Sequence, residues 1–300
     1  MLIGPLTKTT NVSLIEKIPV EEIIRGYNDQ FQVNIRRHFR DIEFVELYKE
    51  NESGYKFFYP MDIEGDNLFY QEMQKFDWYY MKWKWEHANC WKYFETGNKM
   101  LEIGSGNGDF VERMSSLGFQ CFGLELNSEA VEMCQKKGLT VFNETIQEHA
   151  EKKEYDAYDL VCSFQVMEHI GNINEVIEAS IKCLKKGGKL VISVPNNDSF
   201  LGYDRNYLNM PPHHMGLWNK ESLLYLTKIF PLEFISCDFE PLQEYHIEYF
   251  YKTMREHFAR KRSLLNRIRR KVFSLTFPHN LIFFSASMKA FTIQVIYRKI

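Results

Sequence analysis

The sequence has no excess of one charge, no long apolar run and no closely spaced pair of cysteines. Its 300 residues carry 37 basic and 40 acidic side chains, and a net charge of -3 gives no global reason to bind nucleic acid. No run of about 18 apolar residues occurs, so we expect no membrane-spanning segment. The first ten residues lack a basic stretch followed by an apolar one, so we expect no signal peptide.

The cysteines are scattered, and none of the six belongs to a C-x-x-C pair. This spacing argues against a zinc ribbon and against a disulfide framework. Several of them lie in apolar, strand-like runs, where cysteine packs as a small hydrophobic residue. We therefore expect a protein of the reducing cytoplasm.

The composition changes along the chain and predicts two domains. Residues 1–97 are rich in aromatic and charged side chains and poor in glycine, and we expect them to form a helical lid. Its aromatic rings can pack as a core, face a ligand, or do both. Residues 98–300 form the second domain, in which residues 248–285 are a basic amphipathic insertion before the last strand.

The second domain alternates short apolar runs with amphipathic stretches. The expected strands are Met100–Ile103, Gln120–Leu126, Leu139–Phe142, Asp159–Phe164 and Lys189–Val194, and the expected helices are Asp109–Leu117, Ser128–Lys137 and Ile173–Lys185. Gly187 and Gly188 are expected to end the last of these helices. Strands that alternate with helices predict an α/β fold, with a doubly wound parallel sheet covered on both faces.

A glycine cluster, LEIGSGNGD at residues 101–109, follows the first of these strands and opens a helix. Glycines allow a tight turn and close approach of a nucleotide, and an acid about 20 residues further on can bind a ribose. Glu125 stands at that place. A dinucleotide would put its pyrophosphate on the helix N-terminus, where Asp109 would repel it. S-adenosylmethionine (SAM) has no phosphate but carries cationic groups, which Glu102 and Asp109 suit, so the charges favour SAM over NAD.

Four segments together resemble the class I SAM-dependent methyltransferases, of the methyltransferase domain 23/11 type that includes ubiquinone-biosynthesis O-methyltransferases and glycan-cluster methyltransferases. They are LEIGSGNGDF, LELN, YDLVCSFQVMEHI and LKKGGKLVISVPN. The resemblance implies a Rossmann-like sheet of seven strands whose last strand is antiparallel. It also implies a SAM site made by Glu102, Gly104, Ser105, Gly106, Gly108, Glu125, Leu126, Glu144, Thr145, Phe164 and Gln165, in which Glu144 or Thr145 contacts the adenine.

Two segments at the expected active edge carry histidines, the natural bases near neutral pH. Glu168 and His169 follow the fourth strand, and His213 and His214 lie in PPHHMGLW after the fifth. Any of these groups can serve catalysis. Alternatively, Glu168 and His169 can cap the following helix or brace the loop, and the histidine pair can simply pack against Trp218. Some relatives bind a metal through E-x-x-E-H, but Gln165 replaces the first carboxylate here, so we expect no metal.

The expected function is methyl transfer from SAM, most simply to an oxygen of a small-molecule, glycan or lipid-linked acceptor. The alternatives are an NAD-dependent oxidoreductase and a catalytically silent SAM-binding protein. Lys252–Lys271 is rich in basic residues with interleaved apolar ones, which is typical of contact with a membrane surface or of a solvated helix. No RNA-binding module accompanies it, so we expect no nucleic-acid partner.

Overall fold

The main sheet has seven strands in the spatial order β10–β11–β8–β7–β4–β5–β6 among the residues that the computed structural model describes, which are 1–76, 79, 81–152, 156–203, 205–260, 268, 269, 271, 273 and 291–300. The strands are β4 (Lys99–Ile103), β5 (Gln120–Leu124), β6 (Val141–Phe142), β7 (Tyr158–Phe164), β8 (Leu184–Pro195), β10 (Leu232–Phe239) and β11 (Thr292–Lys299). The last strand, β11, runs antiparallel to both of its neighbours, whereas β4 to β8 pair in parallel. The predicted Rossmann-like sheet is confirmed.

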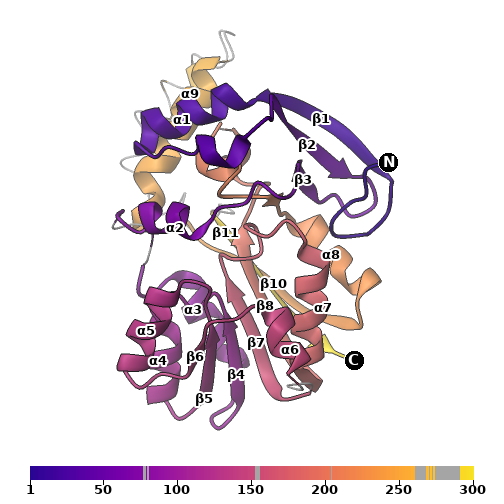
Figure 1. Ribbon diagram of the computed structural model, residues 1–300, viewed down its shortest axis with the longest axis vertical. Coiled ribbons are helices and arrows are strands. Elements are labelled where there is room, and N and C mark those ends of the chain that lie inside the picture. Colours follow the sequence, from indigo (N-terminus) through magenta and orange to yellow (C-terminus); the bar gives the residue numbers. More distant parts are fainter. Residues whose placement is uncertain are drawn as a thin grey trace.

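Helices cover both faces of this sheet (Figure 1). Because side chains alternate along a strand, Met100 and Leu160 pack on one face with Phe110, and Leu101 and Val161 pack on the other. The first face is covered by α3 (Trp85–Cys90) and α4 (Asp109–Ser116), and the second by α6 (Ile146–Glu151), α7 (Ile173–Cys183) and α8 (Lys220–Ile229). The helix α5 (Ser128–Lys136) packs beside β6.

The strand β8 begins earlier than the sequence predicts. Helix α7 ends at Cys183, and Leu184 already has an extended backbone, with ψ of 138°. Leu184 pairs with Tyr158, but Lys189 pairs with Leu160, so the intervening residues bulge out of the ladder. Gly187, with φ of +79°, lies in this bulge. The two glycines therefore accommodate a bulge inside a strand and do not end the helix as predicted.

The winding of the sheet reverses between β4 and β7. From β4 the chain moves outward through β5 and β6, then returns to β7 on the other side of β4 and continues to β8. In open α/β sheets, ligands bind at the carboxyl ends of the two strands that flank this reversal. The glycine loop follows β4, and Gln165 to His169 follow β7, so both predicted motifs meet at this point.

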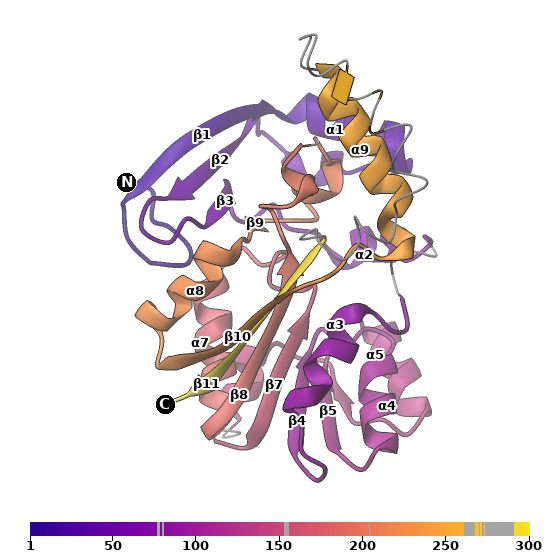
Figure 2. The same cartoon turned by 180° about the vertical axis from the view of Figure 1, so that it is seen from behind.

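The N-terminal extension contributes three strands of a second sheet, in addition to the expected helices. The order of this sheet is β1–β2–β3–β9, all antiparallel. The strands are β1 (Val12–Pro19), β2 (Phe44–Glu50), β3 (Lys56–Tyr59) and β9 (Gly216–Leu217), and the helices are α1 (Val20–Phe31) and α2 (Asn67–Met73). The strand β9 begins two residues after His214 and pairs with β3 of the extension. This pairing holds the segment that carries His213 and His214 against the extension. Figure 2 shows this unit capping the carboxyl edge of the main sheet.

The described part of the basic insertion begins with α9 (Ile247–Arg260), which lies on the same side of the molecule as α1 (Figures 1 and 2). Most of the remaining insertion, including the greater part of residues 261–290, falls outside the described residues. Among those described, no helix is long and apolar enough to cross a bilayer.

Candidate functional site

A cavity of about 1180 Å³ opens at the carboxyl edge of the main sheet, beneath the N-terminal extension. The glycine loop and the carboxyl ends of β5 and β7 line the cavity on the side of the main sheet. The extension contributes Tyr70 and Tyr79, and the C-terminal part contributes Glu240 and Lys252. One continuous space therefore joins the predicted cofactor residues to the predicted histidines.

The glycine loop has the backbone that a tight nucleotide-binding turn requires. Gly104 and Gly106 have φ of +72° and +52°, in the left-handed region that L side chains rarely adopt. The amide of Gly106 donates a hydrogen bond to Glu125 Oε2 at 2.8 Å, and the amide of Asn127 donates to Oε1 at 2.9 Å. The carboxylate of Glu125 is thus fixed beside the loop, at the cavity wall.

One predicted cofactor residue does not line the cavity. Gly108 is the N-cap of α4, with φ of +76°, and a Cβ there would lie 2.8 Å from Cys134 Sγ and from Leu139 Cδ1. The structure therefore corrects its expected role: Gly108 lets α4 and α5 pack closely, and its neighbours Gly106 and Asn107 are the residues that face the cavity.

The loop after β6 also lines the cavity, but its polar side chains already make hydrogen bonds within the protein. Glu144 pairs with His149 Nδ1 at 2.6 Å and with Lys152, and the Thr145 hydroxyl caps α6 by accepting from Glu148 N at 3.1 Å. The Thr145 amide is used as well, since it donates to Glu148 Oε2 at 2.8 Å, so the predicted adenine contact of Glu144 or Thr145 stays a prediction. Leu126, exposed by 56%, offers an apolar surface at the same wall.

Buried polar groups surround the end of β7. Phe164 packs edge-on to Phe110 at 4.9 Å between ring centroids, and Gln165 donates to Glu86 Oε1 at 3.3 Å. Glu102 is 4% exposed, and its Oε2 has no hydrogen-bond partner among the described residues; the same holds for Ser105 Oγ. Burial raises the pKa of Glu102 well above its ordinary value, and the nearby carboxylates of Glu125 and Asp109 raise it further.

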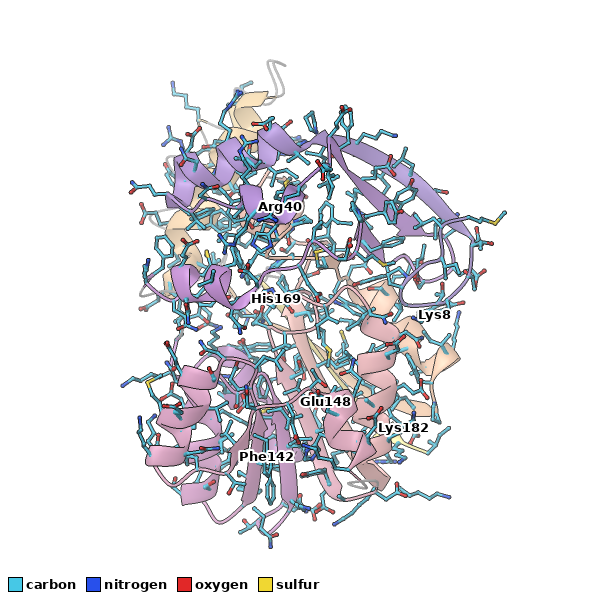
Figure 3. All side chains as sticks on the ribbon, in the orientation of Figure 1. Lys8, Arg40, Phe142, Glu148, His169 and Lys182 are labelled. Carbon is cyan, nitrogen blue, oxygen red and sulfur yellow. The ribbon has the colours of Figure 1, made fainter. Side chains whose placement is uncertain are left out.

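The three predicted histidines form one cluster, and His169 is marked at the centre of Figure 3. The ring centroid of His169 lies 4.5 Å from that of His213 and 5.0 Å from that of His214. Burial lowers the pKa of His169 to about 4 and lowers the pKa values of His213 and His214 well below the ordinary value. All three imidazoles are therefore neutral at neutral pH.

Glu168 lies beneath this cluster and does not cap the next helix. It is 2% exposed, burial raises its pKa to about 8, and its Oε2 has no hydrogen-bond partner within the described part of the chain. The N-cap of α7 is Asn172, so neither Glu168 nor His169 has the capping role that was the alternative.

Several residues that line the cavity were not singled out by the sequence: Lys84, Glu86, Asn209, Glu240, Tyr245 and His246. They belong to the extension and to the segments around β9 and β10, which have no family motif. Among the aromatic side chains between residues 55 and 94, Tyr55, Phe57, Phe58 and Phe69 are buried in the core, whereas Tyr70 and Tyr79 line the cavity. Trp78 and Tyr80 lie outside the described residues.

We expect the folded protein to lose stability relative to its Glu240→Gln variant as the pH rises from 5 to 8. Burial, reinforced by nearby Glu86, raises the pKa of Glu240 to about 7, although Tyr245 Oη and Thr292 N donate to it. The folded state thus holds this proton after the unfolded chain has released it, and the stabilisation is lost between pH 4.5 and 7. The expected difference is about 2 to 3 kcal/mol, measured by urea unfolding. A difference in unfolding free energy between the two proteins that does not change with pH would contradict the raised pKa of Glu240.

Comparison with known proteins identifies the family of the domain that contains the main sheet. The sequence model of a family described as "Methyltransferase domain" matches residues 78–232. The ubiquinone biosynthesis O-methyltransferase of Erwinia tasmaniensis is 26% identical over 144 residues, which are 46% of this chain and 56% of that protein. The enzyme of the same name from Burkholderia vietnamiensis is 32% identical over 108 residues, 34% of this chain and 47% of its own. The chain thus spans about half the length of these relatives.

A solved structure of a SAM-dependent methyltransferase from Archaeoglobus fulgidus aligns with 71% of this chain and 92% of its own, at 18% identity and a TM-score of 0.49. The family match ends at residue 232 and begins at residue 78. The β1–β2–β3–β9 sheet, apart from β9, and the insertion around α9 lie outside it.

Proposed function

Because the chain belongs to the class I SAM-dependent methyltransferases, we propose that it transfers a methyl group from SAM to an oxygen atom of a small-molecule, glycan or lipid-linked acceptor. The observation that carries this proposal is the single cavity, in which the glycine loop with Glu125 faces a buried histidine cluster. The names of the relatives, which are O-methyltransferases, support oxygen as the receiving atom.

The residues of the loop fit SAM. The molecule carries a sulfonium and an ammonium, and Glu102, Asp109 and Glu125 all line this part of the cavity. The unpartnered Glu102 Oε2 and Ser105 Oγ are polar atoms that a bound ligand would satisfy, since buried polar groups are usually hydrogen-bonded. When bound, SAM supplies an electrophilic methyl group.

The chemistry requires alignment and the removal of one proton. Methyl transfer to an acceptor oxygen would leave the sulfur of SAM as a neutral thioether. The acceptor proton must leave, and neutral His169 is the proposed proton acceptor, with His213 and His214 beside it. Glu168 beneath the cluster would stabilise the imidazolium that forms.

The expected assay result is methyl transfer to a hydroxyl group. The protein would be incubated with methyl-labelled SAM and a panel of phenols, sugars and lipids from a cell extract. Formation of S-adenosylhomocysteine would be measured. Label recovered as a methyl ether supports the proposal, whereas label on nitrogen or carbon contradicts the choice of oxygen. SAM binding without any turnover across the panel would favour the silent alternative.

SAM binding should release a proton from Glu102. The raised pKa keeps this carboxyl protonated while no cation is near, and a bound ammonium favours its charged form. Calorimetry in Tris and in phosphate, which differ in ionisation enthalpy, should therefore give different binding enthalpies for the wild type and matching ones for Glu102→Gln. Equal enthalpies in the two buffers for the wild type would show that Glu102 does not change its protonation.

The NAD-dependent alternative has less support. Asp109 lies in the first turn of α4 and lines the cavity, where a pyrophosphate would meet its charge. An NAD oxidoreductase would also leave the family match without an explanation.

The helix α9 is the proposed point of contact with a lipid-linked acceptor or an anionic membrane surface. Lys252 lines the cavity, and Arg255 of the same helix lies over the Tyr251 ring at 5.4 Å, so α9 brings a basic side chain to the cavity wall. The rest of the predicted basic segment lies largely outside the described residues. Flotation with anionic vesicles should carry the protein upward at low salt; absence of flotation would remove this part of the proposal.

A further inference from the structure

The three histidines converge with their ring nitrogens close together. One ring nitrogen of each of His169, His213 and His214 lies within 4.8 Å of the others, and the side chains are largely buried. They come from two segments, the loop after β7 and the segment before β9. The second segment is held by main-chain bonds, since Phe58 N donates to Met215 O at 2.9 Å and Gly65 N donates to Pro212 O at 2.8 Å.

Hydrogen bonds set which nitrogen of His169 and His213 carries the proton. Nδ1 of His169 lies 2.6 Å from the carbonyl oxygen of His213, and Nδ1 of His213 lies 2.9 Å from that of Leu208. A carbonyl oxygen only accepts, so Nδ1 must be the donor in both rings. In a neutral ring the lone pair is then on Nε2.

A chain of amides gives the same answer for His214. Asn197 Nδ2 donates to the carbonyl oxygens of Pro195 and Trp218, so Asn197 Oδ1 accepts from Asn209 Nδ2 at 2.7 Å. Asn209 Oδ1 is therefore the atom that faces His214 Nδ1, at 2.9 Å, and it accepts the ring proton. All three rings are anchored through Nδ1–H to an oxygen, which is the way metal-binding histidines are usually oriented.

A buried carboxyl provides a second, independent observation. Glu168 Oε1 lies 4.0 Å from His169 Nε2, and Glu168 Oε2 has no hydrogen-bond partner among the described residues. At His213 Nε2 a metal ion would displace the Tyr79 hydroxyl, which lies 3.3 Å away in a long hydrogen bond.

We propose that His169, His213 and His214 bind one divalent transition-metal ion through their Nε2 atoms, with a further coordination position open to the cavity. Imidazole ligands suit zinc and its neighbours, whereas Mg²⁺ and Ca²⁺ prefer oxygen ligands. In a tetrahedral zinc site the nitrogens lie roughly 3.3 Å apart, so the rings would move closer together on binding. The sequence-based expectation of no metal rested on the missing first carboxylate of E-x-x-E-H, and it did not bring His213 and His214 beside His169.

The role of the ion rests on the proposed function, although its binding does not. At the open position it would polarise the acceptor oxygen and lower the pKa of the hydroxyl. The histidine nitrogens would then hold the ion in place of acting as the base.

The test uses the full-length protein, treated with a chelator and titrated with Co²⁺, whose visible absorption reports coordination by nitrogen. We expect saturation at one ion per chain, and displacement by Zn²⁺. His214→Gln should weaken Co²⁺ binding more than about 100-fold, and Asn209→Leu, which removes only the anchor of that ring, about 10- to 100-fold. His257→Gln is the matched control, because His257 stacks on Tyr203 at 4.3 Å and is not in the cluster.

Absence of stoichiometric Co²⁺ binding by the wild type would overturn the proposal, and so would equal affinities for the wild type and His214→Gln. SAM affinity is measured on the same preparation. A chain that binds SAM and no Co²⁺ refutes the metal site alone, and a chain that binds Co²⁺ and no SAM refutes the proposed function alone.

Discussion

Gly106→Val should weaken SAM binding by at least about 100-fold, equivalent to roughly 3 kcal/mol. The backbone of Gly106 has φ of +52°, which a β-branched residue strongly disfavours, and its amide donates to Glu125. A valine would strain the turn, fill the cavity wall and disturb the carboxylate that is expected to hold the ribose. Isothermal titration calorimetry with SAM measures the change.

The control for this variant is Gly187→Val. Gly187 also has a positive φ, of +79°, and nothing lies within 4 Å of a Cβ added there. It is in the bulge of β8, far along the strand from the cavity. This variant should lose stability through backbone strain but keep its SAM affinity. Equal affinity for SAM in Gly106→Val and Gly187→Val would show that the glycine loop does not hold the ligand.

His169→Ala and His214→Ala should each lower kcat by about 10²- to 10⁴-fold while leaving SAM affinity within about twofold of the wild type. The cluster faces the cavity but is separate from the glycine loop, so it should act on the acceptor and not on the donor. A loss is expected whether these rings accept a proton or hold a metal, and the Co²⁺ titration distinguishes the two roles.

Single-turnover measurements at saturating SAM give the readout, with His257→Ala as the comparison. That variant removes a histidine of α9 that is not in the cavity wall and should retain wild-type turnover. Full activity in both His169→Ala and His214→Ala would exclude the cluster from the reaction.

The parts of the fold that follow local patterns could be predicted from the sequence. Strands β4, β5 and β7 are short apolar runs, and Gly138 ends α5 with φ of +80° as its position suggests. The start of β8 could not be predicted, because Gly187 marks a bulge as readily as a helix end. The strand β9 was missed because it has only two residues and pairs with β3, which is far away in the sequence.

In the candidate site, too, the features set by a local motif could be predicted and those set by distant contacts could not. Glu125 and the glycine loop are about 20 residues apart in one βαβ unit, so their proximity follows from the motif. His169 and His213 lie 44 residues apart, and nothing local shows that their rings are 4.5 Å from each other. Gly108 was assigned to the ligand, but its Cβ position meets Cys134, which only the packing of α4 on α5 reveals.

Calorimetric titration of the unmodified protein with SAM, S-adenosylhomocysteine and NAD tests most directly that the loop after β4 holds a cationic nucleoside. We expect one molecule of SAM or of its product to bind per chain, and NAD to give no heat beyond dilution. Binding of NAD together with no binding of SAM or S-adenosylhomocysteine would contradict it.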